Sequence, residues 1–146
     1  MPLGRAQRLR SYRGLRALVT GASSGIGRAL ALRLAREGAR VALVARREPQ
    51  LHEVAAEIEA RGGEALVLPA DLGDLAQALS CAEKATVAFG GVDLLVNNAG
   101  YGHHRRFLDW DLADMEQLMR VNYFGALRMT KALLPQMVAR ERGWVV

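Results

Sequence analysis

Short runs of apolar residues alternate along the chain with longer segments in which apolar residues recur every three or four positions. The short runs are rich in Val and Leu and cover 15–20, 40–45, 64–69 and 92–97. Most of their positions are apolar in succession, which is typical of strands that helices cover on both faces. We therefore expect four buried strands that pair in parallel, since helical crossovers connect parallel neighbours.

The segments between these runs predict helices. Apolar residues follow i, i+3, i+4, i+7 spacing over 51–58, and the same spacing recurs over 75–89. Asp74 and Gln77 resemble an N-terminal capping box in front of the second of these helices. The alternation of strand and helix predicts the α/β class, with a doubly wound parallel sheet of the Rossmann type.

A longer helical pattern covers 111–139 and is rich in Met. We expect its apolar stripe to pack into the core and Pro135 to bend or end the helix near Leu134, because proline removes a helical hydrogen bond. Asn122 lies on the same stripe. A buried amide without hydrogen-bond partners costs about 1–3 kcal/mol, so we expect Asn122 to be hydrogen-bonded.

The last residues predict the start of a further strand. Gly143 ends the helical pattern, and 144–146 reads Trp-Val-Val. Strands commonly run about 5–6 residues, so we expect the sheet to be incomplete, with strands one to four and only the start of strand five. The expected organisation is a leader over 1–14 and one truncated nucleotide-binding domain over 15–146.

The positive charge of the chain is concentrated in the leader. The formal net charge is +5, and five of the 20 Lys and Arg residues lie within 1–16, which has no acidic residue. The remaining 15 basic residues are matched by 15 acidic ones. We interpret the leader as a solvated terminus, with contacts to nucleic acid, an anionic membrane or an import system as alternatives. Tyr12 is its only aromatic residue, and stacking on bases usually needs more, so we expect no nucleic-acid partner.

Composition also limits the cellular setting. No run approaches 18 apolar residues, so we expect no membrane span, and the N-terminus lacks the apolar stretch of a secretory signal. Cys81 is the single cysteine and fits both a reducing compartment and a helical core position. These observations favour a cytoplasmic protein.

The segment from Thr20 to Gly27 follows the first predicted strand and opens a helix. Glycines at this place let the backbone approach a pyrophosphate, and the start of the helix offers free N–H groups to the anion. The spacing is G-x-x-x-G-x-G and differs from the G-x-G-x-x-G form. The expected cofactor contacts in this turn are Gly21, Ser23, Ser24, Gly25, Ile26 and Gly27.

The end of the second predicted strand indicates which dinucleotide is bound. NAD sites place an acidic residue there for the ribose 2′-hydroxyl, but this chain has Arg46 and Arg47. One arginine–phosphate pairing of about 1.5–3 kcal/mol would favour NADP over NAD by about ten- to a hundredfold. We expect NADP, with Arg46 as the better candidate. The alternative is that both arginines are solvated surface residues.

The glycine turn and the segment Asn97-Asn98-Ala99-Gly100 together resemble the short-chain dehydrogenase/reductase family. The resemblance covers about Leu15 to Val146. It implies that Asp71 and Leu72 contact the adenine ring, and that Asn98, Ala99 and Gly100 lie beside the adenine-side ribose and the central sheet. It also implies that Asn122 supports the active site and a proton-relay water.

The family's catalytic Ser and Tyr-x-x-x-Lys have no counterpart in the chain. None of Tyr12, Tyr101 and Tyr123 is followed by Lys four residues later. The resemblance implies an oxidoreductase that transfers a hydride between NADP(H) and a small alcohol or carbonyl substrate, in a homo-oligomeric full-length parent. We expect this chain to hold the cofactor-binding half and to be inactive alone. The alternative is a noncatalytic nucleotide-binding or interaction module.

Histidines follow the Asn-Asn-Ala-Gly segment. His103 and His104 could line a substrate mouth, but the third histidine, His52, lies on a different predicted helix. A metal site would need a third ligand, so we predict no metal and interpret these histidines as part of a solvent-exposed loop.

Overall fold

The computed structural model describes residues 9 and 11–146, so the prediction for the leader falls mostly outside the described residues. One parallel sheet has the strand order β3-β2-β1-β4-β5. Its strands are β1 (Arg16–Thr20), β2 (Arg40–Ala45), β3 (Glu64–Pro69), β4 (Leu94–Val96) and β5 (Trp144–Val145). The predicted α/β class and sheet are confirmed. The fifth strand is short, and it pairs with β4 through Trp144 and Val145.

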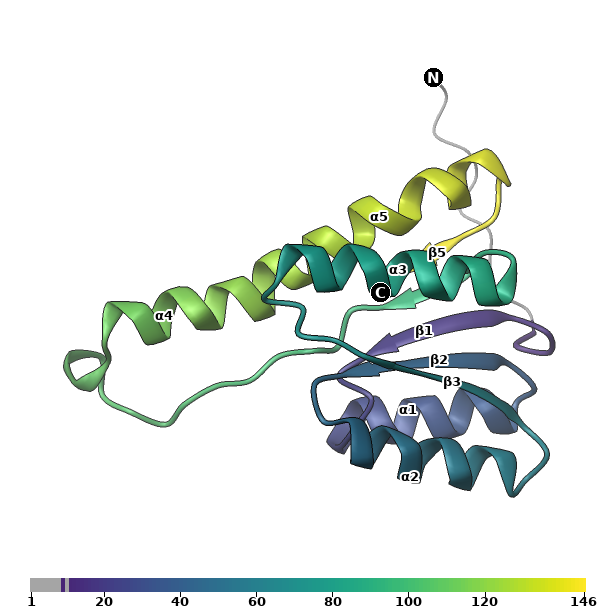
Figure 1. The fold of residues 1–146 in the computed structure, drawn as a ribbon, viewed down its shortest axis with the longest axis horizontal. Helices are drawn as coiled ribbons and strands as arrows, with labels where there is room; N and C mark the ends of the chain where they lie inside the picture. Colours follow the sequence, from purple (N-terminus) through teal and green to yellow (C-terminus); the bar gives the residue numbers. More distant parts are fainter. Residues whose placement is uncertain (1–8, 10) are drawn as a thin grey trace.

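Helices cover both faces of the sheet, as the apolar runs predict. In Figure 1, α1 (Gly25–Arg36) and α2 (Glu48–Glu59) lie on one face, and α3 (Leu75–Phe89) and α5 (Ala126–Ala139) lie on the other. Alternate strand residues separate into two buried clusters. Val41 belongs to the cluster under α1 and α2, whereas Ala42 belongs to the one under α3 and α5. This alternation explains why nearly every strand position is apolar.

The start of α3 follows the predicted cap in part. The Asp74 carboxylate accepts a hydrogen bond of 2.8 Å from the backbone N–H of Gln77. The Gln77 side chain does not return to Asp74, as a capping box requires, but accepts from the backbone N–H of Asp71 at 3.0 Å. The cap therefore also fixes the loop that leaves β3.

The long helical segment is continuous but changes its winding. It consists of α4 (Leu112–Met119), a π-helical stretch η2 (Arg120–Gly125) and α5. Of the two expected effects of Pro135, an end of the helix near Leu134 is wrong, because α5 continues to Ala139. The alternative, a bend at Pro135, stays a prediction. Leu133 and Met137 are buried on either side of Pro135 and hold the helix against the core. Pro135 itself is exposed, so solvent can reach the carbonyl that lost its partner.

The Met-rich stripe is a core feature only in its second half. The buried residues of α5 are Met129, Leu133 and Met137, whereas α4 buries none of its residues. Figure 1 shows why, since α4 extends beyond the sheet. Packing of this stripe into the core is therefore confirmed for α5 and wrong for α4.

A buried carboxylate lies where β4 begins. The Asp93 side chain is 2% exposed and accepts two hydrogen bonds from the Arg16 guanidinium, at 2.9 and 2.7 Å. Arg140 lies 2.8 Å from the same carboxylate and Arg142 lies 3.5 Å from it. Burial would raise the pKa of the Asp93 carboxyl, but the hydrogen bonds from Arg16 and Arg140 hold that pKa well below its ordinary value.

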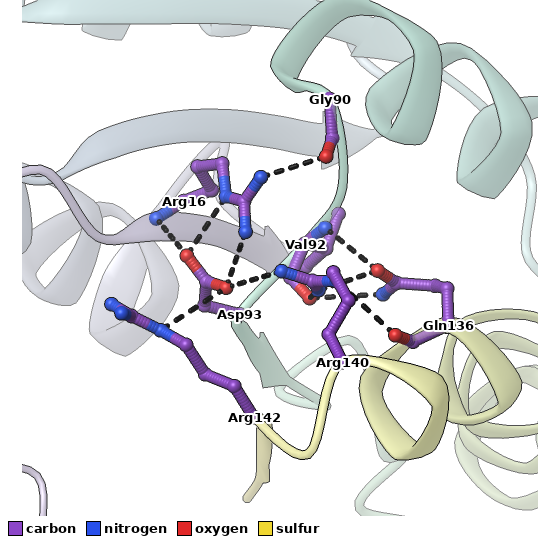
Figure 2. Close-up of polar contacts among 7 residues, drawn as sticks. All are labelled: Arg16, Gly90, Val92, Asp93, Gln136, Arg140 and Arg142. Carbon is purple, nitrogen blue, oxygen red and sulfur yellow. Dashed lines mark hydrogen bonds and ion pairs between the residues drawn. The ribbon is translucent and has the colours of Figure 1, made fainter.

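The same cluster ties the end of α5 to the sheet, as Figure 2 shows. The Gln136 amide donates to the carbonyl of Val92 at 2.9 Å, and Arg140 donates to that carbonyl at 2.6 Å. The N–H of Trp144 then donates to the carbonyl of Asp93 at 2.8 Å. These contacts set the place where the chain leaves α5 and enters β5.

Cys81 is buried in the core, as predicted, and burial raises the pKa of its thiol to about 11. No helix in the described part of the chain is both long and apolar enough to cross a membrane.

Candidate functional site

A cleft of about 620 Å³ opens where the strands end. It lies at the carboxyl edge of the sheet, between the segments that leave β1, β2, β3 and β4. Ligands bind at this edge in open α/β sheets. All the cofactor contacts expected from the sequence line the cleft except Gly27. The other lining residues are Val44, Ala45, Ala70, Tyr101 and Val121.

The turn between β1 and α1 needs its glycines for two reasons. Gly21 and Gly25 adopt left-handed φ values of 68° and 56°, which side chains disfavour. At Gly27, a Cβ atom would overlap the carbonyl of Gly21 and the amide of Asn98. Gly27 therefore packs the turn and does not face the cleft. A Cβ at Gly25 would meet no described atom within 4 Å, so its backbone is open to the cleft.

Thr20 fastens this turn to the end of β4. Its hydroxyl is buried, donates to the carbonyl of Val96 at 3.1 Å and accepts from the N–H groups of Asn98 and Ala99, both at 2.9 Å. The Asn98 amide donates back to the carbonyl of Thr20 at 3.0 Å. The Asn-Asn-Ala-Gly segment therefore braces the glycine turn, in addition to lining the cleft.

The start of α1 is prepared for an anion. Its N-cap, Ser24, makes no side-chain capping bond, and the first turn has no acidic residue. The free N–H groups and the positive end of the helix dipole therefore remain available. Arg47 donates to the Ser24 hydroxyl at 2.7 Å and to the Ser23 hydroxyl at 3.1 Å. Arg46 lines the same cleft.

Asp71 and Leu72 form the side of the cleft next to β3. One Asp71 oxygen accepts from the N–H of Gly73 at 2.9 Å, which holds the carboxylate in a local turn. Leu72 is buried, and its carbonyl accepts from Arg128 of α5 at 2.9 Å. The loop after β3 is thus held by a local turn at Asp71 and by a side chain of α5.

Asn122 is exposed, so the expectation that it lies on a buried stripe was wrong. Within η2, only Val121 and Gly125 are buried. Its amide is nevertheless paired, since it accepts from the N–H of Tyr101 at 3.0 Å and donates to the carbonyl of Tyr101 at 2.8 Å. Asn122 therefore holds the backbone of Tyr101, in the segment that follows β4 and lines the cleft.

The loop after Gly100 forms an aromatic arch, residues 101–110. The His103 ring packs edge-on against Tyr101 at 5.4 Å and against Trp110 at 5.5 Å. The residues between these rings are exposed, in agreement with the predicted solvent-exposed loop. In the described part of the chain no group of three or more His, Cys, Asp or Glu could hold a metal.

Sequence reasoning missed the roles of Thr20 and Tyr101. Thr20 is a polar residue that ends an apolar strand directly before a glycine turn, and a buried hydroxyl there requires several partners. Tyr101 follows Gly100 directly and was considered only as a catalytic tyrosine. Its position in the segment that follows β4 was the available signal for a cleft residue.

Comparison with known proteins agrees with this geometry. The sequence profile of the family described as short chain dehydrogenase matches residues 16–146. The chain is 43% identical to a fatty acyl-CoA reductase of Acinetobacter baylyi, over 93% of this chain and 47% of the relative. It is 34% identical to the ketoacyl reductase HetN of a Nostoc species, over 91% of this chain and 46% of the relative. The chain thus spans about half the length of the curated relatives it matches.

Solved structures share the fold. A metagenomic short-chain oxidoreductase in complex with NADP matches with a TM-score of 0.87 and 39% identity, over 91% of this chain and 61% of that one. L-Sorbose reductase from Gluconobacter frateurii, complexed with NADPH and L-sorbose, matches with a TM-score of 0.88 and 34% identity, over 92% and 52%. With its profile match, strand order and cleft, this chain belongs to the short chain dehydrogenase family of oxidoreductases.

Proposed function

We propose that the protein containing this chain is an NADP-preferring oxidoreductase that transfers a hydride between NADP(H) and a small alcohol or carbonyl substrate. The observation that carries the proposal is one cleft that joins an uncapped, glycine-lined helix start to two guanidinium groups. Two solved relatives that share the fold are described with NADP and NADPH.

The residues of the cleft fit a dinucleotide that lies across the sheet edge. The bare backbone at Gly25 and the first-turn amides of α1 suit the pyrophosphate. Arg46 and Arg47 follow β2 and suit the additional 2′-phosphate. Arg47 is already turned toward the phosphate turn by its bonds to Ser23 and Ser24, so it competes with Arg46 as the main phosphate contact.

The half of the cleft next to β4 suits the nicotinamide end of the dinucleotide, where the hydride is transferred. Strand order places β2 and β3 on one side of the glycine turn and β4 on the other, so a dinucleotide centred on the turn reaches Gly100 and Tyr101 with its second half. Asn122 keeps the backbone of Tyr101 in place there. When bound, NADPH supplies the hydride. The family resemblance assigns proton transfer to a Ser and a Tyr-x-x-x-Lys that these 146 residues do not contain.

Cofactor preference can be measured on the chain itself by isothermal titration with NADP⁺ and NAD⁺. We expect NADP⁺ to bind about ten- to a hundredfold more tightly. The double variant R46A/R47A should lose this preference while its affinity for NAD⁺ stays nearly unchanged. R33A, which removes an exposed arginine of α1 that pairs with Glu37, serves as the control and should keep the preference. Equal affinity for both nucleotides, or no binding of either, would overturn the proposal.

A whole-protein assembly is part of the same proposal. The family resemblance implies a homo-oligomeric parent.

A further inference from the structure

A second recess lies at the amino edge of the sheet, where the strands begin, opposite the cofactor cleft. It has a volume of about 540 Å³ and is lined by the ends of α1 and α2 and the starts of β2 and β3. Because α1 and α2 cover the same face of the sheet, their last turns open toward the same place. The turns that follow them, 37–39 and 61–63, also line this recess, which we call the amino-edge pocket.

The amino-edge pocket is rich in arginine. Its four arginines come from the segment before β1, the end of α1, the start of β2 and the turn after α2, and they are Arg13, Arg36, Arg40 and Arg61. Three glutamates line the pocket as well, and they are Glu37, Glu57 and Glu64. Which of these charges already have partners decides what a ligand would meet there.

All three glutamates of the pocket are already paired with arginine. The pairs are Arg40–Glu64 at 2.6 Å, Arg61–Glu57 at 3.1 Å and Arg33–Glu37 at 2.8 Å. Glu57 also pairs with Arg28 of α1. Arg40 is fixed further, because its guanidinium lies over the ring of Phe89 at 4.6 Å. The carboxylates of the pocket are therefore neutralised by arginines that hold them in place.

Arg13 and Arg36 remain after this pairing. Within the described part of the chain, neither guanidinium has a carboxylate at ion-pair distance, and both residues are exposed. The helix ends do not occupy them either, since the carbonyls of Ala35 and Glu59 accept from the N–H groups of Gly38 and Gly62, both at 2.9 Å. Two positive charges from different segments thus line one recess without a balancing anion.

The base of the amino-edge pocket is apolar. Its apolar lining residues are Leu32, Ala35, Ala39 and Ile58. Ala39 and Ile58 belong to the core under α1 and α2, whereas Leu32 and Ala35 are only half-buried and pack against that core. A ligand in the pocket would therefore meet free cations at the rim and apolar side chains beneath them.

These features specify the chemistry of a ligand. A guanidinium presents five N–H donors in a plane and suits the oxygens of a phosphate. A phosphate monoester carries about two negative charges at neutral pH, which matches the two unpaired arginines. We propose that the amino-edge pocket binds a phosphate monoester, with its phosphate at Arg13 and Arg36 and its organic part against Leu32 and Ala35.

This site is separate from the proposed cofactor site. The amino-edge pocket and the cofactor cleft have no lining residue in common, and they lie at opposite ends of the strands. A phosphate ester could nevertheless also enter the glycine turn of the cleft. An experiment therefore has to locate the bound ester as well as measure its affinity.

Titration of the intact chain with phenyl phosphate, followed by amide NMR, locates the binding. We expect the backbone amides of Gly38, Gly62 and Gly63 to shift, because all three residues line the amino-edge pocket. R36E should weaken this binding at least about tenfold, since it replaces a donor to the phosphate with a repelling charge. R13E should act in the same direction. K84E makes the same reversal at an exposed lysine of α3 and should leave the affinity unchanged.

Other anions test the class of ligand. Inorganic phosphate should shift the same amides but bind at least about threefold more weakly than phenyl phosphate, because it buries no apolar surface. Benzoate keeps the ring but has one negative charge, and it should also bind more weakly. Vesicles of phosphatidylcholine with and without phosphatidate distinguish a soluble ester from a lipid headgroup. Circular dichroism melts check that each variant is folded.

Three outcomes would overturn the proposal. The first is a set of shifts confined to Gly25 and its neighbours that disappears in R46A/R47A but persists in R36E, which would place the ester in the cofactor cleft only. The second is an equal loss of affinity in R36E and K84E. The third is binding to phosphatidate vesicles without binding of the free ester. NADP⁺ titration of R36E should give the native affinity, which keeps this test independent of the proposed cofactor site.

Discussion

The two edges of the sheet are held together by different chemistry. At the amino edge, guanidinium–carboxylate pairs join the starts of neighbouring strands: Arg16 with Asp93 between β1 and β4, and Arg40 with Glu64 between β2 and β3. At the carboxyl edge, the ends of β1 and β4 are joined through the single hydroxyl of Thr20 and the backbone groups around it. The connection between β1 and β4 is thus ionic at the amino edge and neutral at the carboxyl edge.

The amino edge therefore stabilises the sheet, whereas the carboxyl edge also forms the proposed nucleotide site. Ionic pairs at the amino edge fix the strands without placing side-chain charge in the cleft. The neutral ties at the carboxyl edge leave the helix dipole of α1 and the two arginines after β2 as the main positive features that an incoming anion meets there. Substitutions at the amino edge should therefore change stability, and substitutions at the carboxyl edge should change both stability and nucleotide affinity.

The substitution with the largest expected effect is D93N. It leaves Arg16 and Arg140 without their buried carboxylate, and breaking a buried pair in this way costs about 3 kcal/mol or more of the free energy of unfolding. E64Q breaks the exposed pair on the same edge and should cost less than about 1 kcal/mol. Urea denaturation of both variants measures the difference. Similar losses in the two variants would contradict the distinction between buried and exposed pairs.

Acid should remove the contribution of Asp93. Its pKa in the folded chain lies below the ordinary value of about 3.9 for an unfolded Asp, so the folded state binds fewer protons. The resulting stability is complete well above about pH 4 and declines as the pH falls through that value and toward the folded pKa. The gap in free energy of unfolding between the native chain and D93N should shrink from pH 7 to pH 3. A constant gap over this range would exclude this linkage.

At the carboxyl edge, G27A should be the more severe change. The new methyl group overlaps the carbonyl of Gly21 and the amide of Asn98, and forced overpacking costs about 2–3 kcal/mol. G102A adds the same methyl group where no described atom lies within 4 Å, and should be neutral. Thermal melts test stability, and NADP⁺ titration should show weaker binding for G27A only. If G102A is equally destabilised, steric packing at Gly27 is not the cause.

T20V removes the hydroxyl that joins the ends of β1 and β4, and it has the smallest expected effect on stability of the three main substitutions. Valine keeps the shape of threonine but leaves the N–H groups of Asn98 and Ala99 without their acceptor, at a cost of about 1–2 kcal/mol. T86V removes a hydroxyl that bonds only to the carbonyl of Ala82 within α3 and should cost less. Hydrogen exchange at Asn98 and Ala99 should accelerate in T20V. Unchanged exchange there would show that the hydroxyl does not hold β4 to β1.

Sequence patterns were sufficient for the sheet and for most of the cleft, because both follow from local rules. Consecutive apolar runs mark buried parallel strands, and a glycine turn after the first strand marks the phosphate end of the cleft. The Asp74 half of the predicted capping box succeeded for the same reason, since a cap and its helix are neighbours in sequence, whereas the Gln77 side chain bonds to Asp71 instead.

The features that were mispredicted or not predicted depend on contacts distant in sequence. The burial of Asn122 depends on what packs over η2, and periodicity alone does not reveal that the sheet ends before α4 begins. The continuation of α5 through Pro135 depends on the burial of Leu133 and Met137 against strands far away in the chain. The Asp93 cluster joins residues 77 and 47 positions apart. No local pattern announces such pairs.

The two tryptophans lie in different surroundings and can serve as separate optical signals. Trp110 lies in the aromatic arch and contacts the ring of His103, whereas Trp144 begins β5 and is bonded to the backbone of Asp93. The variant W144F keeps only Trp110, which is linked to the cleft residue Tyr101 through the ring of His103, and W110F keeps only Trp144. Emission from the first can follow nucleotide entry, and emission from the second can follow acid loosening of the opposite end, in the same molecule and without an attached dye.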